Sequence, residues 1–485
     1  YEYSGIKGLR QQGFQETDIV GMAKPITKYA VQIRNPEDIV QELNKAYHIA
    51  TTGRRGPVLI DLPMNIQRSE VENPVYNMTF EDIHTDAAQA QKAADTILEA
   101  LETAKRPVIM LGHGVDSSAS QRELIQFARK RQIPIITSVL AKSVLGYEHP
   151  LNFGCIGGAY GHRYANMIAN AKSDLLLCFG ISLCTRQIGT KVHEFTKGAK
   201  IIRVDIDSCN LQRDIHENGA NEVKLQAETG AVIDCLSRAA VQKPDEYREW
   251  LNVCNEIKEN LQAVDDQTPE RYPNRMIASL SEMLEDTSAI AVDVGQHMVW
   301  SYQSFKNHEG QKLLFSGGHG AMGYGLPAAI GAKFGYPDTP VICVSGDGGV
   351  QMNIQELATA TAYGLPVILC IFNNSYLGMV RQWQQLFYGK RYSSTCTRRR
   401  KSCSATCKGP GEQCPKYQPD FVKLAESYEA YGMRIEKEED IKKAFEFAKE
   451  HTDAPTILEF MIDSDELVLP MVQGGQALDC MILDC

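Results

Sequence analysis

The chain has 485 residues, of which 43% are hydrophobic and 23% charged, and its formal net charge is −10 at pH 7. This length exceeds what one hydrophobic core supports and predicts about three globular domains. The acidic balance argues against a nucleic-acid-binding surface, and no apolar run approaches the roughly 20 residues of a membrane helix. Residues 1–5 lack the pattern of a signal or transit peptide, which predicts a cytoplasmic protein. They also lack a Met, so we expect the chain to be part of a longer one.

The 14 cysteines fall into two groups. Four of them, Cys396, Cys403, Cys407 and Cys414, are clustered in one segment. The others are scattered through apolar or helical stretches, as Cys178 is. Scattered cysteines in a long chain without a signal peptide are typical of reduced, buried thiols in the cytosol.

Residues 1–75 have the pattern of the last part of an α/β domain. We expect Asn35 to cap a helix that carries Pro36 in its first turn and ends near Thr51. The residues that follow at 58–63 predict a strand. A single strand–helix–strand remnant predicts that the beginning of this domain is missing.

A polar linker at about residues 67–86 precedes the second unit, which we place at residues 88–240. Apolar runs in this unit, each followed by a glycine-containing or polar turn, predict a second parallel sheet. A charged helical stretch at about residues 244–262 then leads to the third unit, at residues 265–475. The expected strands of the second unit are residues 107–111, 134–137, 174–179 and 200–205.

The third unit contains two apolar runs that each end in a polar side chain. Residues 340–344 lead into Asp347, within the turn Ser-Gly-Asp-Gly-Gly, and residues 366–372 lead into Asn374. Residues 351–363 between them have the pattern of a helix, so the three segments predict a βαβ unit. Further strands are expected at residues 289–294 and 455–462.

Such crossovers are nearly always right-handed, so both strand ends should emerge at the same edge of a parallel sheet. Asp347 and Asn374 can then meet beside the glycine-rich turn. A carboxylate and a carboxamide offer the hard oxygen ligands that Mg²⁺ prefers, and unobstructed backbone N–H groups suit a diphosphate. A Gly-Asp-Gly turn alone is common; the second strand end and the glycine-dense residues 317–325 make the functional interpretation the stronger one.

Longer stretches around these motifs resemble the thiamine-diphosphate-dependent enzymes, and within them most closely the acetolactate synthase large subunit. The resemblance covers essentially the whole chain. It implies three consecutive doubly wound parallel-sheet α/β domains, the first incomplete: a pyrimidine-binding part, a central domain of FAD or nucleotide type, and a diphosphate-binding domain. The matching stretches are residues 14–20, 25–28, 293–297, 320–329, 373–384 and 469–472.

The resemblance also implies the roles of individual residues. Mg²⁺ would be bound by Asp347, the side-chain oxygen of Asn374 and the backbone carbonyl of Tyr376. Met322 would be the apolar wedge that bends the bound cofactor; by itself a single Met is more often a core residue. The cofactor-binding set is Gln296, His297, Gly320, Met322, Gly348, Gly349, Asn374, Tyr376, Gly378 and Met379, and the catalytic set is Gln15, Met322, Trp383 and Arg186.

Trp383 and Arg186 match positions that contact the second substrate in this family. The arginine suits the carboxylate of that substrate. A core residue on a helix face and a surface ion pair are their structural alternatives. The family's catalytic glutamate has no match in this sequence, since Glu2 and Glu16 stand in other contexts. We expect it upstream, so that this chain supplies only part of an active site.

The central unit departs from the family's FAD pattern. Arg54, Arg186 and Asp205 fit it, but residues 182–186 keep only the last residue of Arg-Phe-Asp-Asp-Arg. Tyr-Gly-His also replaces Met-His-Gly at residues 160–162. The sequence therefore supports FAD binding less well than it supports thiamine diphosphate binding. The central unit resembles equally well the acetolactate-synthase-like proteins of surface-polysaccharide pathways.

The clustered cysteines lie in an insertion at residues 394–418 that also carries Arg398-Arg399-Arg400-Lys401. Their spacing differs from the paired Cys-x-x-Cys pattern of zinc sites, so a solvated loop is favoured over a Cys₄ zinc site.

The leading hypothesis is decarboxylation of pyruvate and its ligation to a second 2-oxo acid, with thiamine diphosphate and Mg²⁺. The alternatives are a related enzyme that decarboxylates a 2-oxo acid or uses another acceptor, such as a sugar, and a non-catalytic cofactor-binding protein. The resemblance further implies a homodimer or tetramer and a possible small regulatory subunit.

Overall fold

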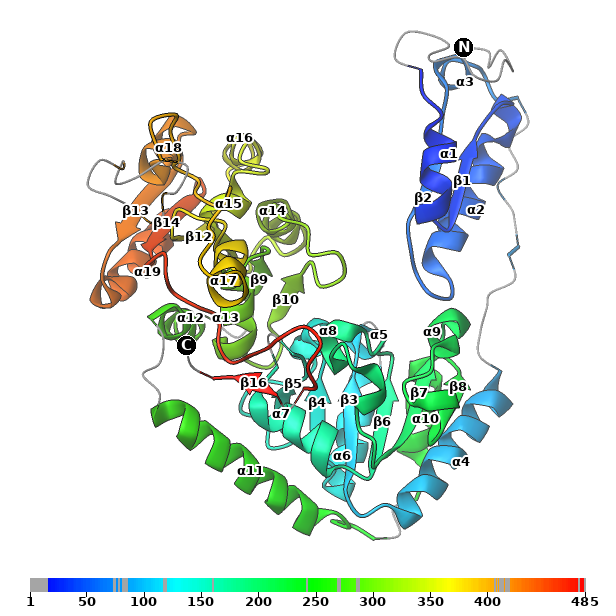
Figure 1. Ribbon diagram of the computed structural model, residues 1–485. Coiled ribbons are helices and arrows are strands. Elements are labelled where there is room, and N and C mark those ends of the chain that lie inside the picture. Colours follow the sequence, from blue (N-terminus) through cyan, green and yellow to red (C-terminus); the bar gives the residue numbers. More distant parts are fainter. Residues whose placement is uncertain are drawn as a thin grey trace.

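The computed structural model describes residues 16–72, 76, 79–80, 86–116, 120–158, 161–240, 243–267, 272–284, 288–404, 407, 409, 414, 419–478 and 480–483. It is an α/β chain with two six-stranded parallel sheets, as the sequence predicts. A two-stranded parallel sheet lies near the N-terminus and a two-stranded antiparallel one near the C-terminus. Figure 1 shows the small N-terminal unit beside α9 of the central unit, and Arg54 forms an ion pair with Asp207 there.

The N-terminal unit contains the expected strand–helix–strand arrangement, with β1 paired to β2. Its helix ends at Thr51, as predicted, but its start differs. Asn35 makes no capping hydrogen bond through its side chain, and Pro36 opens a short 3₁₀ turn before the α-helix begins. The elements are α1 (Ile19–Ala23), η1 (Lys24–Ile26), β1 (Tyr29–Gln32), η2 (Pro36–Asp38), α2 (Ile39–Thr51), β2 (Val58–Asp61) and α3 (Met64–Gln67).

The central sheet has the strand order β5-β4-β3-β6-β7-β8. This is the doubly wound order whose connections reverse direction between β3 and β6. The strands are β3 (Pro107–Leu111), β4 (Ile135–Thr137), β5 (Asn152–Cys155), β6 (Leu175–Phe179), β7 (Lys200–Asp205) and β8 (Glu222–Gln226). The other elements are α4 (Ala87–Thr103), α5 (His113–Asp116), α6 (Gln121–Arg131), η3 (Val139–Val144), α7 (Arg163–Met167), η4 (Ile168–Lys172), α8 (Thr185–Ile188), η5 (Val192–Glu194), α9 (Ser208–Gln212), η6 (Glu217–Gly219) and α10 (Thr229–Arg238).

The long helix α11 (Arg248–Gln267) connects the central unit to the C-terminal one, whose strand order is β10-β9-β11-β12-β14-β13. The connections reverse between β9 and β11, so a crevice opens at their carboxyl ends. The strands are β9 (Ala289–Val292), β10 (Lys312–Phe315), β11 (Val341–Gly346), β12 (Val367–Asn373), β13 (Tyr431–Ile435) and β14 (Thr456–Met461). The other elements are α12 (Tyr272–Glu282), α13 (Gln296–Ser304), α14 (Gly325–Gly335), α15 (Asp347–Val350), α16 (Glu356–Ala362), α17 (Gly378–Phe387), α18 (Phe421–Ser427), η7 (Glu438–Asp440) and α19 (Ile441–Glu450).

The predicted helix at residues 351–363 is wrong in its extent. A short helix, α15, starts at Asp347 itself, and α16 covers only the second half of the predicted range. In the two six-stranded sheets, four strands were not predicted, and these are the edge strands β5, β8, β10 and β13. Edge strands are partly exposed and carry polar residues, so they lack the continuous apolar run of an inner strand.

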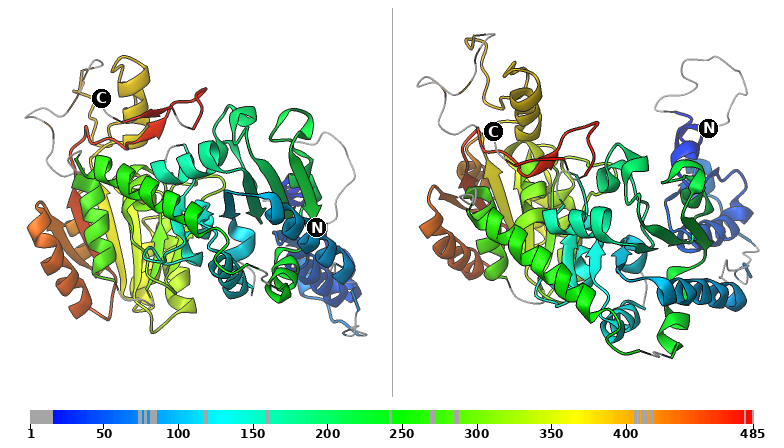
Figure 2. Two further views of the ribbon diagram at one scale, coloured as in Figure 1. Left: turned by 90° about the horizontal axis from the view of Figure 1, so that it is seen from below. Right: turned by 60° about the horizontal axis from the view of Figure 1, so that its bottom comes forward.

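The two large sheets have separate cores, and a C-terminal segment joins them. Figure 2 shows this segment passing from the C-terminal unit to the central one. It carries β15 (Met471–Val472) and β16 (Met481–Ile482). Val472 N donates to Gly158 O of the central unit at 2.7 Å, and Leu478 is buried in the central core. In the described part of the chain, no helix is both long enough and apolar enough to cross a membrane.

Candidate active site

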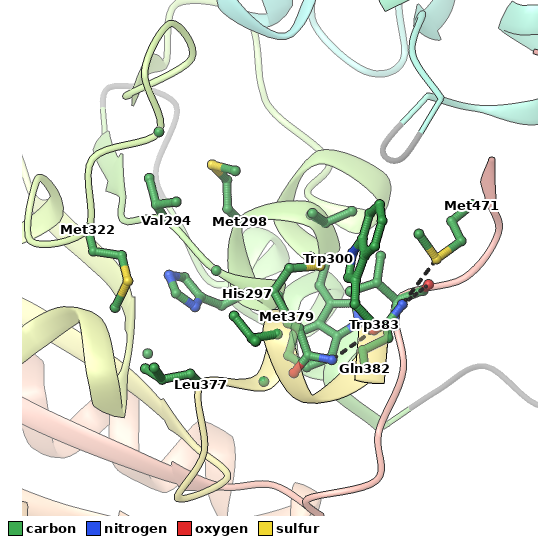
Figure 3. A pocket seen from close by; sticks show the side chains of 18 of the residues that line it. Val294, His297, Met298, Trp300, Met322, Leu377, Met379, Gln382, Trp383 and Met471 are labelled. Atoms are coloured by element: carbon green, nitrogen blue, oxygen red, sulfur yellow. Dashed lines mark hydrogen bonds between the residues drawn. The ribbon is translucent and has the colours of Figure 1, made fainter. Parts of the chain in front are cut away.

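A cavity of about 550 Å³ lies where the sheet of the C-terminal unit faces the central unit and the C-terminal segment. Figure 3 shows Met322, His297 and Leu377 converging at one end, with Trp383 and Met471 at the other. Every residue of the predicted sites except Gln15 lines this cavity, and Gln15 lies outside the described residues. The lining includes Arg186, Gln296, His297, Gly320, Met322, Asp347, Gly348, Gly349, Asn374, Tyr376, Gly378, Met379 and Trp383.

Asp347 occupies the carboxyl end of β11 and is 3% exposed. Burial raises the pKa of its carboxyl group to about 7, although the Thr397 hydroxyl and the Asn374 and Gly348 backbone groups favour the ionised form. In the described part of the chain, Asp347 forms no ion pair with a Lys, Arg or His. A buried carboxylate without a positive partner is costly, so this donor suits a bound cation.

The turn after β12 brings further oxygen atoms to the same place. Asn374 Oδ1 accepts a hydrogen bond from Tyr376 N at 3.0 Å, and Asn374 Nδ2 donates to Gln296 Oε1 at 3.1 Å. Ser375 between them has a φ of 61°, in the left-handed region. The turn therefore points the backbone of Tyr376 away from the regular strand direction.

Gln296 holds this turn with its side chain. Its amide Nε2 donates to Gln382 Oε1 and to Glu466 O, both at 2.9 Å. Both side-chain amide hydrogens thus have partners. The backbone N–H of Gln296 lies in the first turn of α13, where it has no partner within the helix, so it can bind a ligand. Gly378 leaves room for the arrangement, because a Cβ there would lie 1.9 Å from Gln296 Oε1.

His297 is enclosed by glycines. A Cβ on Gly295 would lie 2.7 Å from its Cε1, and one on Gly346 would lie 2.9 Å from its Nδ1. Burial lowers the pKa of His297 to about 4, and the neighbouring Asp293 carboxylate and carbonyl only partly oppose this effect. Its Nε2 is buried and has no hydrogen-bond partner in the described structure. The ring is therefore neutral near pH 7 and directed at the cavity.

Apolar side chains form the wall next to the Asp347 turn. A Cβ on Gly348 would lie 2.7 Å from Leu377 Cδ2 and 3.6 Å from Met322 Cε, so all three residues meet at one point. Met322 remains 38% exposed, which shows that its side chain faces the cavity and not a closed core.

The two residues predicted to contact the second substrate line the cavity from different units. Trp383 is 40% exposed on α17 and makes an edge contact with Phe387. Arg186, on α8 of the central unit, reaches across so that its Nη1 lies 3.9 Å from the Cβ position of Gly320. Arg186 thus lies beside the glycine-rich loop that carries Met322, whereas Trp383 lies at the other end of the cavity.

Three positioning residues were not predicted. Asp293 accepts hydrogen bonds from Gly323 N at 2.9 Å and from Ser345 Oγ at 2.9 Å, and so holds the glycine-rich loop against β11. Gln382 binds the C-terminal segment, because its Oε1 accepts from Val468 N at 2.7 Å. Thr397 donates to Asp347 at 3.0 Å. Asp293 stood at a predicted strand end and could have been found, whereas the other two depend on contacts between distant segments.

The cysteine insertion is only partly described. Cys396 pairs with Tyr376 in an isolated antiparallel bridge. No group of three or more His, Cys, Asp or Glu suited to a metal occurs among the described residues. Much of residues 405–418 lies outside them, so the choice between a Cys₄ zinc site and a solvated loop stays untested. Cys178, Cys343 and Cys370 are buried free thiols, as predicted, whereas the scattered Cys209 is exposed.

Comparisons with known proteins identify the family of the chain. The central domain of thiamine pyrophosphate enzymes matches residues 94–236, and their C-terminal TPP binding domain matches residues 293–460. The acetolactate synthase large subunit of Corynebacterium glutamicum is 35% identical over 98% of this chain and 73% of its own. A probable large subunit from Methanocaldococcus jannaschii is 36% identical, over 97% and 77%. That of Lactococcus lactis is 31% identical, over 99% and 79%. Likeness at this level along nearly the whole chain means that the protein belongs to the acetolactate synthase large-subunit family of thiamine pyrophosphate enzymes.

Proposed function

We propose that the protein binds thiamine diphosphate through Mg²⁺ in this cavity and joins a two-carbon unit from pyruvate to a second 2-oxo acid. The observation that carries the proposal is the buried Asp347 carboxylate, which lies at the apex of a glycine turn beside the Asn374 turn. Asp347, Asn374 Oδ1 and the Tyr376 carbonyl are hard oxygen donors on neighbouring strand ends. Mg²⁺ favours such donors, completed by phosphate oxygens and water.

The diphosphate would be held by backbone N–H groups. Those of Gln296 and His297 begin α13, and those of Gly348 and Gly349 lie in α15. Helix N-termini carry unsatisfied donors and a partial positive charge, so they favour phosphate. Side chains at Gly348 or Gly349 would collide with Leu377 or Asp293, which keeps the approach open only for glycine.

When bound, thiamine diphosphate supplies the reactive carbon and the electron sink for decarboxylation and ligation. The chain's own residues orient and enclose it. Met322 and Leu377 give it an apolar bed, and Met379 and Met471 extend that apolar lining away from the diphosphate end. This lining excludes water, which strengthens the electrostatic contacts of Asp347 and the helix termini.

The second substrate would bind against Arg186 and Trp383. A guanidinium recognises a carboxylate through two parallel hydrogen bonds, and an indole packs against a short carbon skeleton. This pairing favours a 2-oxo acid over an uncharged sugar. An acceptor of another kind stays the second candidate, because the central unit departs from the family pattern next to Arg186.

FAD has less support. Asp205 already accepts hydrogen bonds from Asp207 N at 2.9 Å and from Asn210 Nδ2 at 2.6 Å, and Arg54 is paired with Asp207. At the reversal point of the central sheet, Gly114 N donates to Gly180 O at 3.1 Å, so the two loops touch. Asp205 and Arg54 are thus bound by neighbouring residues, and this arrangement does not fit a flavin.

We assign pyrimidine binding to residues 1–75, an accessory role to residues 88–240 and diphosphate binding to residues 265–475, with residues 394–418 as an insertion. We further propose a homodimer or tetramer, and a small regulatory subunit because the relatives are named large subunits.

The test is formation of acetolactate from pyruvate by purified protein that includes any upstream sequence, with Mg²⁺ and thiamine diphosphate. Acetolactate as the product supports the proposal. Release of carbon dioxide without acetolactate would instead favour a decarboxylase or another acceptor. Absence of both, with no cofactor binding, would indicate the non-catalytic alternative.

A further inference from the structure

Glu459 is a buried carboxylate that the proposed cofactor contacts do not use. Its side chain has no exposed surface, and it lies on β14, between β12 and β13. Arg434 stands directly opposite it on β13 and donates from Nε to Glu459 Oε2 at 2.8 Å. Because a buried carboxylate must be paired and hydrogen-bonded, this arginine compensates its charge.

The other oxygen of Glu459 is used toward the active site. Asn373 Nδ2 donates to Glu459 Oε1 at 2.7 Å. Ile371 is the neighbour of Glu459 on β12, and Asn373 lies two residues further on, so it points to the same face of the sheet. The carboxylate therefore fixes the orientation of the Asn373 side chain at the very end of β12.

Asn373 in turn supports the strained residue of the adjacent turn. Its Oδ1 accepts from Ser375 N at 2.9 Å and from Ser375 Oγ at 3.2 Å. Ser375 has a φ of 61°, which residues other than glycine rarely adopt. The conformation of Ser375 decides where Asn374 Oδ1 and the Tyr376 carbonyl lie.

We propose that Glu459 is a positioning residue for the metal-binding turn: through Asn373 it holds Ser375 left-handed and so directs the oxygens of Asn374 and Tyr376 toward Asp347. The inference rests on the proposed Mg²⁺ site. The network continues outward, because Arg434 Nη2 also donates to Asp420 Oδ1 at 2.6 Å.

Glu459→Gln tests the inference, because glutamine keeps the size but cannot accept hydrogen bonds from both Asn373 and Arg434. The readout is the Mg²⁺ concentration that half-saturates thiamine diphosphate binding, followed by tryptophan fluorescence, since Trp383 and Trp300 line the cavity. We expect it to rise at least about 10-fold, as is common when a residue behind a metal ligand is lost. At saturating Mg²⁺, kcat should stay near that of the wild type.

Glu222→Gln is the matched control. Glu222 is equally buried, pairs with Arg203 at 3.6 Å and lies in the other sheet. The E222Q variant should have a lower thermal stability and an unchanged Mg²⁺ dependence of thiamine diphosphate binding. Equal Mg²⁺ dependence of the two variants would overturn the inference.

Ser375→Gly supplies a rescue, because glycine adopts a positive φ without support. The double variant E459Q/S375G should return toward the wild-type Mg²⁺ half-saturation, which a purely structural role of Glu459 does not predict. Failure of the rescue contradicts the inference. If E459Q does not fold, Asp420→Asn replaces it, because this variant removes only the outer ion pair. It should raise the Mg²⁺ concentration for half-saturation by less than the about 10-fold expected for E459Q. An unchanged value would count against the network.

Hydrogen exchange of the ligand-free protein separates this inference from the proposed function. The Ser375 and Tyr376 amides should exchange faster in E459Q than in the wild type and E222Q. If the wild type shows no Mg²⁺-dependent cofactor binding, the proposed function fails; unchanged exchange in E459Q means that the positioning role fails.

Discussion

The Thr397 hydroxyl donates a hydrogen bond of 3.0 Å to Asp347 Oδ2. The two residues come from segments 50 positions apart. Backbone bonds hold the Thr397 segment against the turn after β12, because Thr397 N donates to Ser375 O at 3.0 Å and Leu377 N donates to Thr395 O at 2.7 Å. The first residues of the insertion are thus part of the site and orient the carboxylate that we propose as a Mg²⁺ ligand.

Thr397→Val should weaken Mg²⁺-dependent binding of thiamine diphosphate by about 10-fold, because it removes the donor and keeps the side-chain shape. Titration calorimetry at several Mg²⁺ concentrations measures the effect. Thr456→Val is the control: Thr456 is buried on β14 and its hydroxyl has no partner in the described structure. If both variants bind alike, the Thr397 contact has no role in metal binding.

Gly378→Ala should raise the dissociation constant for the cofactor by more than about 10-fold, since its Cβ would displace Gln296 or Asn374. Equilibrium dialysis at saturating Mg²⁺ reports this directly. Gly331 offers the comparison, because it lies within α14 and a Cβ there meets nothing within 4 Å. Gly331→Ala should stabilise the protein by about 0.5–1 kcal/mol and leave binding intact. Normal cofactor binding by G378A would contradict the steric argument.

Arg186→Gln should raise KM for the second 2-oxo acid by about 10- to 100-fold, because a charge-assisted hydrogen bond to its carboxylate is lost. Cofactor affinity should change less than KM, since Arg186 comes from the central unit, although its Nη1 lies near Gly320. Steady-state kinetics measure KM for the second 2-oxo acid, and fluorescence titration measures the affinity for the cofactor. A changed cofactor affinity with an unchanged KM would assign Arg186 a different role.

The protein should lose stability on acidification partly through His297. Its folded pKa of about 4 lies below the ordinary value of 6.5, so the unfolded state binds more protons. The stabilisation is present above about pH 6.5 and is lost as pH falls toward 4, by about 2 kcal/mol between pH 7 and 5. Urea unfolding of the ligand-free protein measures it, and His297→Asn should show a shallower pH dependence. Parallel curves for both proteins would show that His297 does not titrate in this way.

The sequence predicted the inner strands of both large sheets because these strands are buried on both faces and therefore apolar throughout. Lys312–Phe315 and Glu222–Gln226 are edge strands with exposed polar residues, and only their pairing defines them. Site residues at the ends of inner strands were likewise easier to predict than those elsewhere. Residues at inner strand ends, such as Asp347 and Asn374, could be placed by topology alone.

Contacts between remote segments could not be predicted. Thr397 reaches Asp347 only because its backbone pairs with the Ser375 turn. Glu459 reads as an ordinary strand residue until the register places it opposite Arg434 and next to the end of β12. Side-chain networks of this kind depend on register and on three-dimensional packing, which no local pattern in the sequence encodes.

The cavity wall is divided between two units built on different sheets, with Asp347 and the Asn374 turn on one and Gly158, Thr185 and Arg186 on the other. This division separates the residues proposed to select the second substrate from those proposed to anchor the cofactor. Under the proposed function, substitutions around α8 should change the accepted second substrate more than the anchoring of the cofactor. Exchange of the central unit between relatives is therefore a route to new product ranges from one unchanged cofactor-anchoring unit.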